Sequence, residues 1–424
     1  MEGLGDSRSR SRRSRPPRHS VRSAPHHTIG RIVALSLIFA LSFSGTALGL
    51  SFARFQRNIS QQDIDKLLGD DRPTLPAPVT TEADPNAGRA LNILVIGSDS
   101  RDGGNQSVDG SGTSPGMRSD TTMLVHIAAD RSRVDLVSIP RDTLVDIPEC
   151  HLADGSTTPP KYDAMFNSAF SAGGSTGDVG AAAACTMLTV EQLTGIYIDD
   201  FVVVDFAGFI SVIDSLGGIA MYIPEDIDDK AANLQLDAGC RLLDGTAALG
   251  LARVRKTVGD GSDISRIGRQ QDLVMAVVNE ALTTSLLTNP ARLYQFLDST
   301  TRTLTTGQEV GDLTSLVRLG SSLSALRVED LTLITMPFVW AGARVRPSED
   351  YAAQVWDAIR ADVPPDPLLS GDASDIAVAV MERERAAAEA TQAPTAPAAE
   401  PGIEATTPPA PADEALLCTK KTAT

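Results

Sequence analysis

The pattern of apolar and polar residues predicts a series of strands in the middle of the chain. Asn92–Gly97 is a continuous apolar run that ends in glycine, which is typical of a strand buried on both faces. Thr121–Ile127 and Val134–Ile139 are rich in β-branched residues and are separated by a short polar segment, so they predict a hairpin. Further strands are predicted at Phe201–Phe206, Gly218–Ile223 and Leu331–Met336.

Helical spacing of apolar residues occurs between and after these strands. Ala207–Leu216 has this spacing and stops at a pair of glycines, which commonly end helices. Residues 263–288 predict a long helix with Ser262 or Asp263 as its N-cap. Helices are also predicted at 291–326 and Tyr351–Arg360. Strands that alternate with helices predict an α/β fold, a three-layer α-β-α sandwich around a central mixed β-sheet.

The N-terminal part of the chain has the organisation of a membrane anchor. Residues 1–31 contain eight arginines against Glu2 and Asp6, and residues 32–53 carry no charge. At about 1.5 Å per residue this run spans roughly 33 Å, enough for the hydrocarbon core of a bilayer. We therefore expect a cytoplasmic tail at 1–31, a transmembrane anchor at 32–53 and an extracytoplasmic remainder. A cleaved signal peptide is the alternative, and the length of the run favours the anchor.

A single folded domain is expected over residues 90–366. Residues 54–89 are polar and contain prolines, which predicts a stalk between the membrane and the domain. Residues 367–424 become rich in alanine, proline and threonine, which predicts a disordered tail after one short helix at Ile376–Ala390. The candidate chemistry therefore belongs to one domain.

The distribution of charge limits the classes of partner. The formal net charge is -17, and residues 1–31 contribute about +6, so the remainder carries about -23. A strongly acidic domain does not bind nucleic acid through bulk electrostatics. An anion site must therefore be built locally from specific arginines, and these are densest between residues 253 and 270. Their planar guanidinium groups suit phosphate oxygens.

Four cysteines suit an exported domain, because disulfides form outside the cytoplasm. They are Cys150, Cys185, Cys240 and Cys418. We favour a Cys150–Cys185 bridge because it would fix the loop between these residues. Four cysteines allow three complete pairings, among which the sequence does not choose, and buried or free thiols are the alternative.

Two aspartates are predicted at neighbouring strand ends. Asp99 follows the first strand, and Asp120 immediately precedes the second. Open α/β sheets bind ligands beyond the carboxyl ends of their strands. Mg²⁺ takes one or two carboxylates and completes its shell with phosphate and water. Asp99 and Asp120 are thus candidate ligands of Mg²⁺ or Mn²⁺, whereas the alternative for such a motif alone is an ordinary turn.

Arginines accompany these carboxylates. Arg118 lies two residues before Asp120, and Arg141 follows the proline that ends a predicted strand. Because proline restricts the backbone, we expect Arg141 to be held in place. For each arginine taken singly, the alternative is a surface salt bridge.

The arginine cluster at 253–270 has helical and extended spacing. Arg266 and Gln270 are four residues apart, so they share a face near a helix N-terminus, where backbone N–H groups also favour anions. Arg253 and Arg255 share a face if residues 251–256 are extended. Such a concentration of cations predicts a phosphate site more readily than a solvated surface.

These segments, in this order, resemble the LytR–CpsA–Psr family of bacterial cell-wall enzymes. The resemblance covers residues 90–285 and extends to the short basic tail and the single anchor. The loop between Gly97 and Arg118 is longer than is usual in the family. The matching segments are Asn92–Arg101, Arg118–Thr121, Val137–Asp142, Asn167–Ala169, Leu193–Gly218 and Leu236–Gln271.

The resemblance implies a transferase that moves a phosphate-linked glycopolymer of the teichoic acid, capsule or arabinogalactan type. The donor would be a polyprenyl-pyrophosphate carrier, and the acceptor would be peptidoglycan. The expected partners are these two molecules and the cytoplasmic membrane, with no nucleic acid. The resemblance places Asp99 and Asp120 at a metal, with Asp99, Asp120 and Arg141 as catalytic residues. It places around the pyrophosphate Arg118, Arg141, Arg253, Arg255, Arg266 and Gln270.

Other functions stay open. The protein would be a polyprenyl-pyrophosphate phosphatase if water replaced the acceptor. It would be a binder of lipid-linked wall precursors if it had no turnover. A membrane-bound transcriptional regulator is disfavoured, because about 30 cytoplasmic residues cannot fold a domain that reads DNA.

Overall fold

The computed structural model describes residues 26–69, 72–74, 88–99, 117–254, 263–282, 289–369 and 418. The chain forms two compact units, Met1–Ala53 and Arg54–Thr424. Helix α1 (His26–Asn58) contains the stretch Ala34–Asn58, which has the length and composition of a signal anchor or a membrane span.

The second unit begins earlier than the sequence predicts. Strand β1 (Ser60–Gln61) pairs in parallel with β14 (Leu304–Thr306). Ile64 is 6% exposed and belongs to the main hydrophobic core, next to the short helix α2 (Asp65–Leu68). The first part of the stalk expected at 54–89 is therefore folded, because its few apolar residues find partners far away in the sequence.

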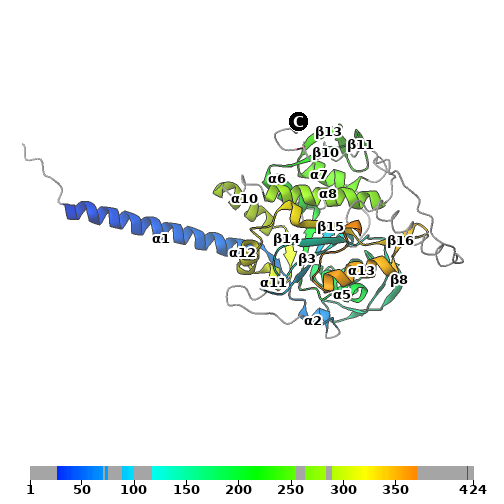
Figure 1. Ribbon diagram of the computed structural model, residues 1–424. Helices are drawn as coiled ribbons and strands as arrows, with labels where there is room; N and C mark the ends of the chain where they lie inside the picture. Colours follow the sequence, from blue (N-terminus) through cyan, green and yellow to red (C-terminus); the bar gives the residue numbers. More distant parts are fainter. Residues whose placement is uncertain are drawn as a thin grey trace, which may run out of the picture. The chain divides into compact units, whose positions relative to one another are not determined.

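A mixed β-sheet forms the centre of the second unit (Figure 1). Besides β1 and β14, its strands are β2 (Leu91–Ser98), β3 (Ser119–Ile127), β4 (Val134–Ser138), β9 (Asp200–Asp205) and β15 (Leu331–Thr335). In the described part of the chain their order is β1-β14-β9-β2-β3-β4-β15. β2 is parallel to β9, β4 is parallel to β15, and β3 is antiparallel to both β2 and β4. The carboxyl ends of β2, β4, β9 and β15 therefore share one edge with the amino end of β3.

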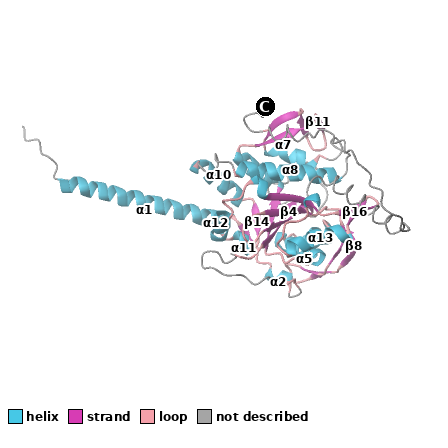
Figure 2. Cartoon of the chain, viewed as in Figure 1, coloured by secondary structure: helices cyan, strands magenta, loops and turns pink. Residues whose placement is uncertain are grey.

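Helices cover both faces of this sheet (Figures 1 and 2). On one face, α5 (Val179–Thr194) and α13 (Glu349–Arg360) share a hydrophobic core with the inward residues of β2, β3, β4 and β15. On the other face, side chains of α8 (Asp263–Ala281) and α12 (Leu313–Ser322) pack against the alternate residues of β2 and β4. The predicted three-layer α-β-α sandwich is confirmed, and burial on both faces explains the continuous apolar runs.

A second hydrophobic core lies between α8 and a group of smaller elements. Helix α6 (Phe206–Leu216) follows β9 directly, and α7 (Gly245–Arg253) follows β13 (Gly239–Leu243). β13 pairs with β10 (Ile219–Ile223), and Ile213, Ile219 and Leu251 are among the buried residues that these elements contribute. This second core holds the elements that carry part of the arginine cluster.

The continuous helix predicted at 291–326 is broken. The structure contains α10 (Pro290–Thr301), the strand β14, α11 (Gln308–Gly311) and then α12. The break coincides with a run of threonines, whose branched side chains favour extended backbone. Helix α8 is described to Ala281, and the end predicted at residue 288 lies outside the described residues, as does the short helix predicted at 376–390.

Two disulfides are present. The expected Cys150–Cys185 bridge joins β6 (Cys150–His151) to α5, with an S–S distance of 2.01 Å. A second bridge of 2.05 Å joins Cys240 on β13 to Cys418, near the end of the chain. The pairing that the sequence left open is thereby assigned, and the tail is covalently tied to the second core.

Further short antiparallel pairs lie outside the central sheet, among them β11 (Ile227–Asp229) with β12 (Leu234–Leu236). β6 pairs with β7 (Thr157–Thr158), β5 (Leu144–Ile147) with β8 (Lys161–Met165), and β16 (Phe338–Ala341) with β17 (Arg344–Pro347). An isolated bridge between Thr143 and Val345 joins the beginning of the β5–β8 hairpin to β17.

Candidate functional site

The two predicted carboxylates lie at the shared edge of the sheet. The β2–β3 register shifts between Gly97 and Ser98, which places an extra residue on β3 at this edge. Asp99 is tied across the strands, because its Oδ1 accepts the backbone N–H of Arg118 at 2.6 Å and its own N–H donates to the Arg118 carbonyl at 3.1 Å. Asp120 follows Ser119 at the start of β3. The strand pairing thus brings Asp99 and Asp120 to neighbouring positions.

Arg141 is held against one of these carboxylates. One guanidinium nitrogen donates to Oδ1 of Asp120 at 2.6 Å, and Nε lies 3.7 Å from Asp142. The Arg141 side chain is 14% exposed. Its carbonyl accepts the backbone N–H of Asn167 at 3.0 Å, so both backbone and side chain are fixed. This agrees with the expectation that the preceding proline positions the arginine.

Arg253 reaches the same edge from a helix. Residues 245–253 form α7, so the extended backbone expected at 251–256 is wrong as far as Arg253. The helix forms because Asp244 caps it, accepting the backbone N–H of Ala247 at 2.8 Å. The Arg253 guanidinium carbon lies 5.1 Å from the ring centroid of Phe206, which directly follows β9. Arg255 lies outside the described residues.

Helix α8 contributes the remaining cluster residues. Arg266 is 3% exposed, although arginine is seldom buried this deeply. One guanidinium nitrogen of Arg269 donates to the Val254 carbonyl at 2.7 Å, and the Gln270 amide donates to the Ala252 carbonyl at 3.4 Å. Arg269 and Gln270 therefore join α8 to the end of α7 in this state.

Two contacts at the candidate site were missed by reasoning from the sequence. The buried Gln271 amide donates to Oγ of Ser138 at 3.2 Å and to Oγ1 of Thr335 at 3.1 Å, at the carboxyl ends of β4 and β15. These two hydrogen bonds hold α8 against the carboxyl ends of β4 and β15. The partners are 133 and 64 residues away, so no local pattern marks them. The second missed contact is that of the Phe206 ring with the Arg253 guanidinium. The position of Phe206 directly after a predicted strand could have indicated that it lies near the site.

The carboxylates fit a divalent cation that is also bound by substrate. Among the described residues, no group of three or more His, Cys, Asp and Glu side chains converges. A complete protein cage is therefore absent from that part of the chain. Two carboxylates at adjacent strand ends match the small protein share of ligands that Mg²⁺ takes when phosphate supplies the rest.

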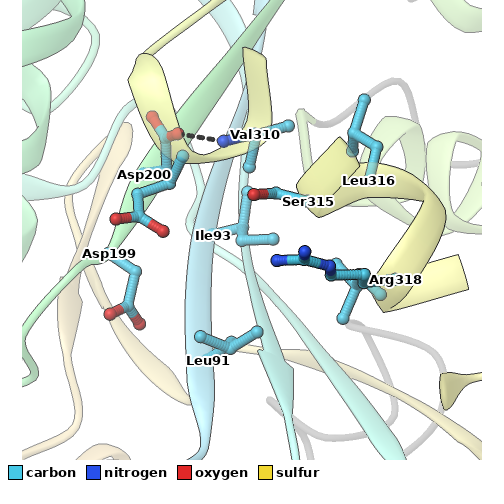
Figure 3. Close-up of a pocket in the computed structure, with 10 residues that line it drawn as sticks. Leu91, Ile93, Asp199, Asp200, Val310, Ser315, Leu316 and Arg318 are labelled. Atoms are coloured by element: carbon cyan, nitrogen blue, oxygen red, sulfur yellow. Dashed lines mark hydrogen bonds between the residues drawn. The ribbon is translucent and has the colours of Figure 1, made fainter. Parts of the chain in front are cut away.

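A separate cavity of about 230 Å³ opens at the opposite edge of the sheet (Figure 3). Asp200 begins β9 there, is 3% exposed, and accepts backbone N–H groups of Phe201 at 2.7 Å and Val310 at 2.5 Å. Burial raises the pKa of Asp200 to about 6 and also raises the pKa of Asp199. None of the predicted site residues that the structure describes lines this cavity, which is bounded by Leu91, Ile93, Asp199, Asp200, Glu309, Val310, Ser315, Leu316, Arg318 and Leu319.

The fold defines an α/β protein, and the site edge gathers several arginines that make it a candidate anion site. Comparison with known families makes this specific. The model of the LytR_cpsA_psr family matches residues 52–359, and the chain belongs to the LytR–CpsA–Psr family. The match begins near the start of the second compact unit, in agreement with the early start of the fold.

Curated relatives carry cell-wall names. The chain is 32% identical over 221 residues to the probable cell wall biosynthesis protein LcpB of Corynebacterium glutamicum, covering 51% of this chain and 48% of that protein. It is 29% identical over 221 residues to the polyisoprenyl-teichoic acid–peptidoglycan teichoic acid transferase TagV of Bacillus subtilis, covering 51% of each chain. The chain spans about half the length of these relatives.

A solved structure supports the fold. Protein gbs0355 from Streptococcus agalactiae superposes with a TM-score of 0.51 at 18% identity, covering 67% of this chain and 91% of that one. At this identity the likeness concerns the fold alone.

Proposed function

We propose that this protein transfers a phosphate-linked glycopolymer from a polyprenyl-pyrophosphate carrier to peptidoglycan. The observation that carries the proposal is the convergence of Asp99, Asp120 and Arg141 with Arg253 at one edge of the sheet. Family membership and the transferase name of TagV support it. A phosphate of the carrier accounts for the concentration of cations in an otherwise acidic domain.

Individual residues would share the work at the phosphates. Arg118, Arg141, Arg253, Arg255, Arg266 and Gln270 would bind the pyrophosphate, with guanidinium groups offering paired N–H donors. Asp99 and Asp120 would hold Mg²⁺ or Mn²⁺, which when bound neutralises charge on the phosphate oxygens. Arg141 would orient Asp120 through the 2.6 Å contact.

In the reaction, an acceptor hydroxyl of peptidoglycan attacks the phosphorus that carries the glycan. A new O–P bond forms, the P–O bond to the carrier breaks, and polyprenyl phosphate leaves. The hydroxyl proton would pass to whichever of Asp99 and Asp120 does not hold the metal, because a metal-bound carboxylate is a poor base. The arginines stabilise the charge that moves onto the leaving phosphate, and their rigid placement is what accelerates the step.

Helix α6 would hold the lipid. It is largely apolar, with Asp214 near its end, and only Gly208, Ile213 and Leu216 of it are buried. The helix starts directly after Asp205, at the carboxyl end of β9, so its partly exposed apolar surface begins beside the phosphate site. A polyprenyl chain attached to a bound pyrophosphate would therefore meet apolar side chains.

The catalytic unit would lie outside the cytoplasm. Arginines crowd the segment before α1, which by the positive-inside rule retains that side in the cytoplasm. Both disulfides of the second unit support this topology, because they form in oxidising compartments.

The test is transfer of a labelled lipid-linked glycan to purified peptidoglycan by the detergent-solubilised chain. Arg141→Lys keeps the charge but removes the planar fork, and we expect transfer to fall about 100-fold. Arg255→Ala should abolish it. Arg327→Lys is the matched control, because Arg327 is 76% exposed and pairs only locally with Glu329.

Normal transfer by folded Arg141→Lys and Arg255→Ala variants would refute the assignment. Release of free glycan phosphate without acceptor would favour the phosphatase. Binding of the carrier without turnover, unaffected by Asp99→Asn or by metal removal, would favour the non-catalytic binder.

A further inference from the structure

The β16–β17 hairpin extends from the site edge on the side away from α6. It follows β15, whose carboxyl end lies at that edge. The Thr143–Val345 bridge joins it to the segment just after Arg141. In the sheet, β2, β3 and β4 lie between β9 and β15. Asp99, Asp120 and Arg141 lie on or next to these three middle strands. Helix α6 follows β9, and the β16–β17 hairpin follows β15.

One large aromatic side chain of this hairpin faces solvent. Trp340 is 47% exposed, whereas Trp356, the other tryptophan of the chain, is 4% exposed. Leaving much of an indole in water forgoes a large apolar burial, so such a residue commonly marks a binding surface. Trp340 therefore calls for a role other than core packing.

The indole packs against a buried cluster that includes a neighbour of Arg266 in the sequence. Its ring lies 5.6 Å from the Phe338 ring at an interplanar angle of 86°. Phe338 is 1% exposed and forms a buried cluster with Val345 and Ile267, and Ile267 follows Arg266 on α8. Trp340 thus contacts Phe338, and Phe338 contacts Ile267, the residue that follows Arg266 on α8.

The hairpin is joined to its neighbours mainly through the backbone of β17. The Thr143–Val345 bridge ties this strand to the start of the β5–β8 hairpin. On the opposite face of β17, Arg346 pairs with Asp163 of β8 at 2.6 Å, but both side chains are about half exposed, so this ion pair adds little. A preorganised aromatic side chain loses little freedom when a ligand binds.

We infer that Trp340 forms a subsite for the acceptor, stacking on a sugar ring of the peptidoglycan glycan strand. The inference rests on the proposed function. Phosphoryl transfer places the attacking and leaving oxygens roughly in line on opposite sides of phosphorus. If the lipid lies along α6, the acceptor approaches from the β15 side, where Trp340 stands. The flat apolar face of a pyranose then packs on the indole ring.

Binding is tested without turnover, so that this inference and the proposed function can fail separately. The probe is a soluble β-1,4-linked tetramer of N-acetylglucosamine, titrated into the detergent-solubilised full chain and followed by calorimetry. We expect Trp340→Ala to weaken binding about 10-fold, which corresponds to 1.4 kcal/mol. Trp340→Tyr should bind within about threefold of wild type, because a planar ring remains. Val317→Ala, which trims a 61% exposed side chain on α12, should bind like wild type.

Kinetics distinguish the acceptor from the donor glycan. Trp340→Ala should raise KM for peptidoglycan about 10-fold and leave KM for the lipid-linked donor within twofold. Equal affinity of wild type and folded Trp340→Ala for the tetramer would overturn the inference, and so would a rise in donor KM alone. If Trp340→Ala does not fold, loss of tetramer binding in Trp340→Gln with retention in Trp340→Tyr supports the inference, and equal binding by both overturns it.

Discussion

Asp200 provides a quantitative test of how the sheet edge opposite the site is built. Its carboxylate is 3% exposed and accepts two backbone N–H groups, while Glu309 lies close enough to raise its pKa further. Burial is the main cause of the rise to about 6. The folded state therefore holds this proton at pH values where the unfolded chain, with a pKa of 3.8, has lost it.

The raised pKa of Asp200 makes the free energy of unfolding depend on pH, because the folded and unfolded states bind this proton with different affinity. A raised carboxyl pKa contributes stability that is complete below pH 3.8 and is lost as the pH rises through about 6. Asp200→Asn mimics the neutral acid, so its stability does not contain this dependence. Between pH 4 and pH 7, the free energy of unfolding of Asp200→Asn should therefore gain roughly 2–3 kcal/mol on that of wild type.

Urea unfolding of the detergent-solubilised chain, followed by circular dichroism at several pH values, measures this difference. The comparison cancels titrations common to both proteins. Replacing one carboxylate oxygen by an amide nitrogen can also change the free energy of unfolding by an amount that does not depend on pH. Such an amount shifts the difference between variant and wild type equally at every pH and leaves its pH dependence unchanged. A difference that stays flat between pH 4 and pH 7 would refute the buried, proton-holding Asp200. Glu309→Gln should move the wild-type transition to lower pH, because one cause of the shift is removed.

Two further predictions concern the elements that place Arg253. A Cβ on Gly245 would lie 2.4 Å from the Ile210 carbonyl oxygen, so Gly245→Ala should separate α6 from α7 and lower the free energy of unfolding by about 1–3 kcal/mol. Gly320→Ala on α12 meets nothing within 4 Å and should instead stabilise by about 0.5–1 kcal/mol, and urea melts that rank the two variants the other way would contradict the close α6–α7 packing. Cys418→Ser opens the Cys240–Cys418 bridge, and we expect a loss of about 2–5 kcal/mol because the cross-link spans 178 residues. Unchanged urea midpoints under non-reducing conditions would show that the bridge adds nothing.

The central strands were predictable because each one contains, in its own short sequence, the apolar and β-branched residues of a buried strand. Asn92–Gly97, Thr121–Ile127 and Val134–Ile139 correspond to β2, β3 and β4, with the hairpin between the last two as expected. Each is covered on both faces: Ile93–Ile96 of β2 is wholly apolar, whereas β3 and β4 also contain buried polar residues such as His126 and Asp135. Phe201–Phe206 corresponds to β9, for the same reason.

Short elements stabilised by distant contacts were not predictable in this way. β1 contains two polar residues, Ser60 and Gln61, and exists because β14 lies alongside it. The prediction of extended backbone at 251–256 was wrong for a different reason. It relied on the alternation of Arg253 and Arg255 and overlooked Asp244, which caps helix α7. Periodicity over a few residues is weak against a capping signal.

The candidate site was half visible in the sequence. Strand-end positions located Asp99, Asp120 and Arg141, because an aspartate next to a strand inherits the geometry of the sheet. The roles of Gln271 and Trp340 depend on contacts across the fold, to Ser138 and Phe338. Whether these residues bind phosphate, metal or glycan stays a prediction that the experiments above address.

The Cys240–Cys418 bridge also changes what proteolysis can do. A protein that is cut once by a protease near its C-terminus commonly loses the segment beyond the cut. Here a cut between residues 370 and 417 would leave the downstream piece bonded to β13, so the molecule would gain only the one water of hydrolysis and lose no segment until the disulfide is reduced. The protein would thus survive as a nicked but covalently complete molecule, visible as two fragments only on a reducing gel.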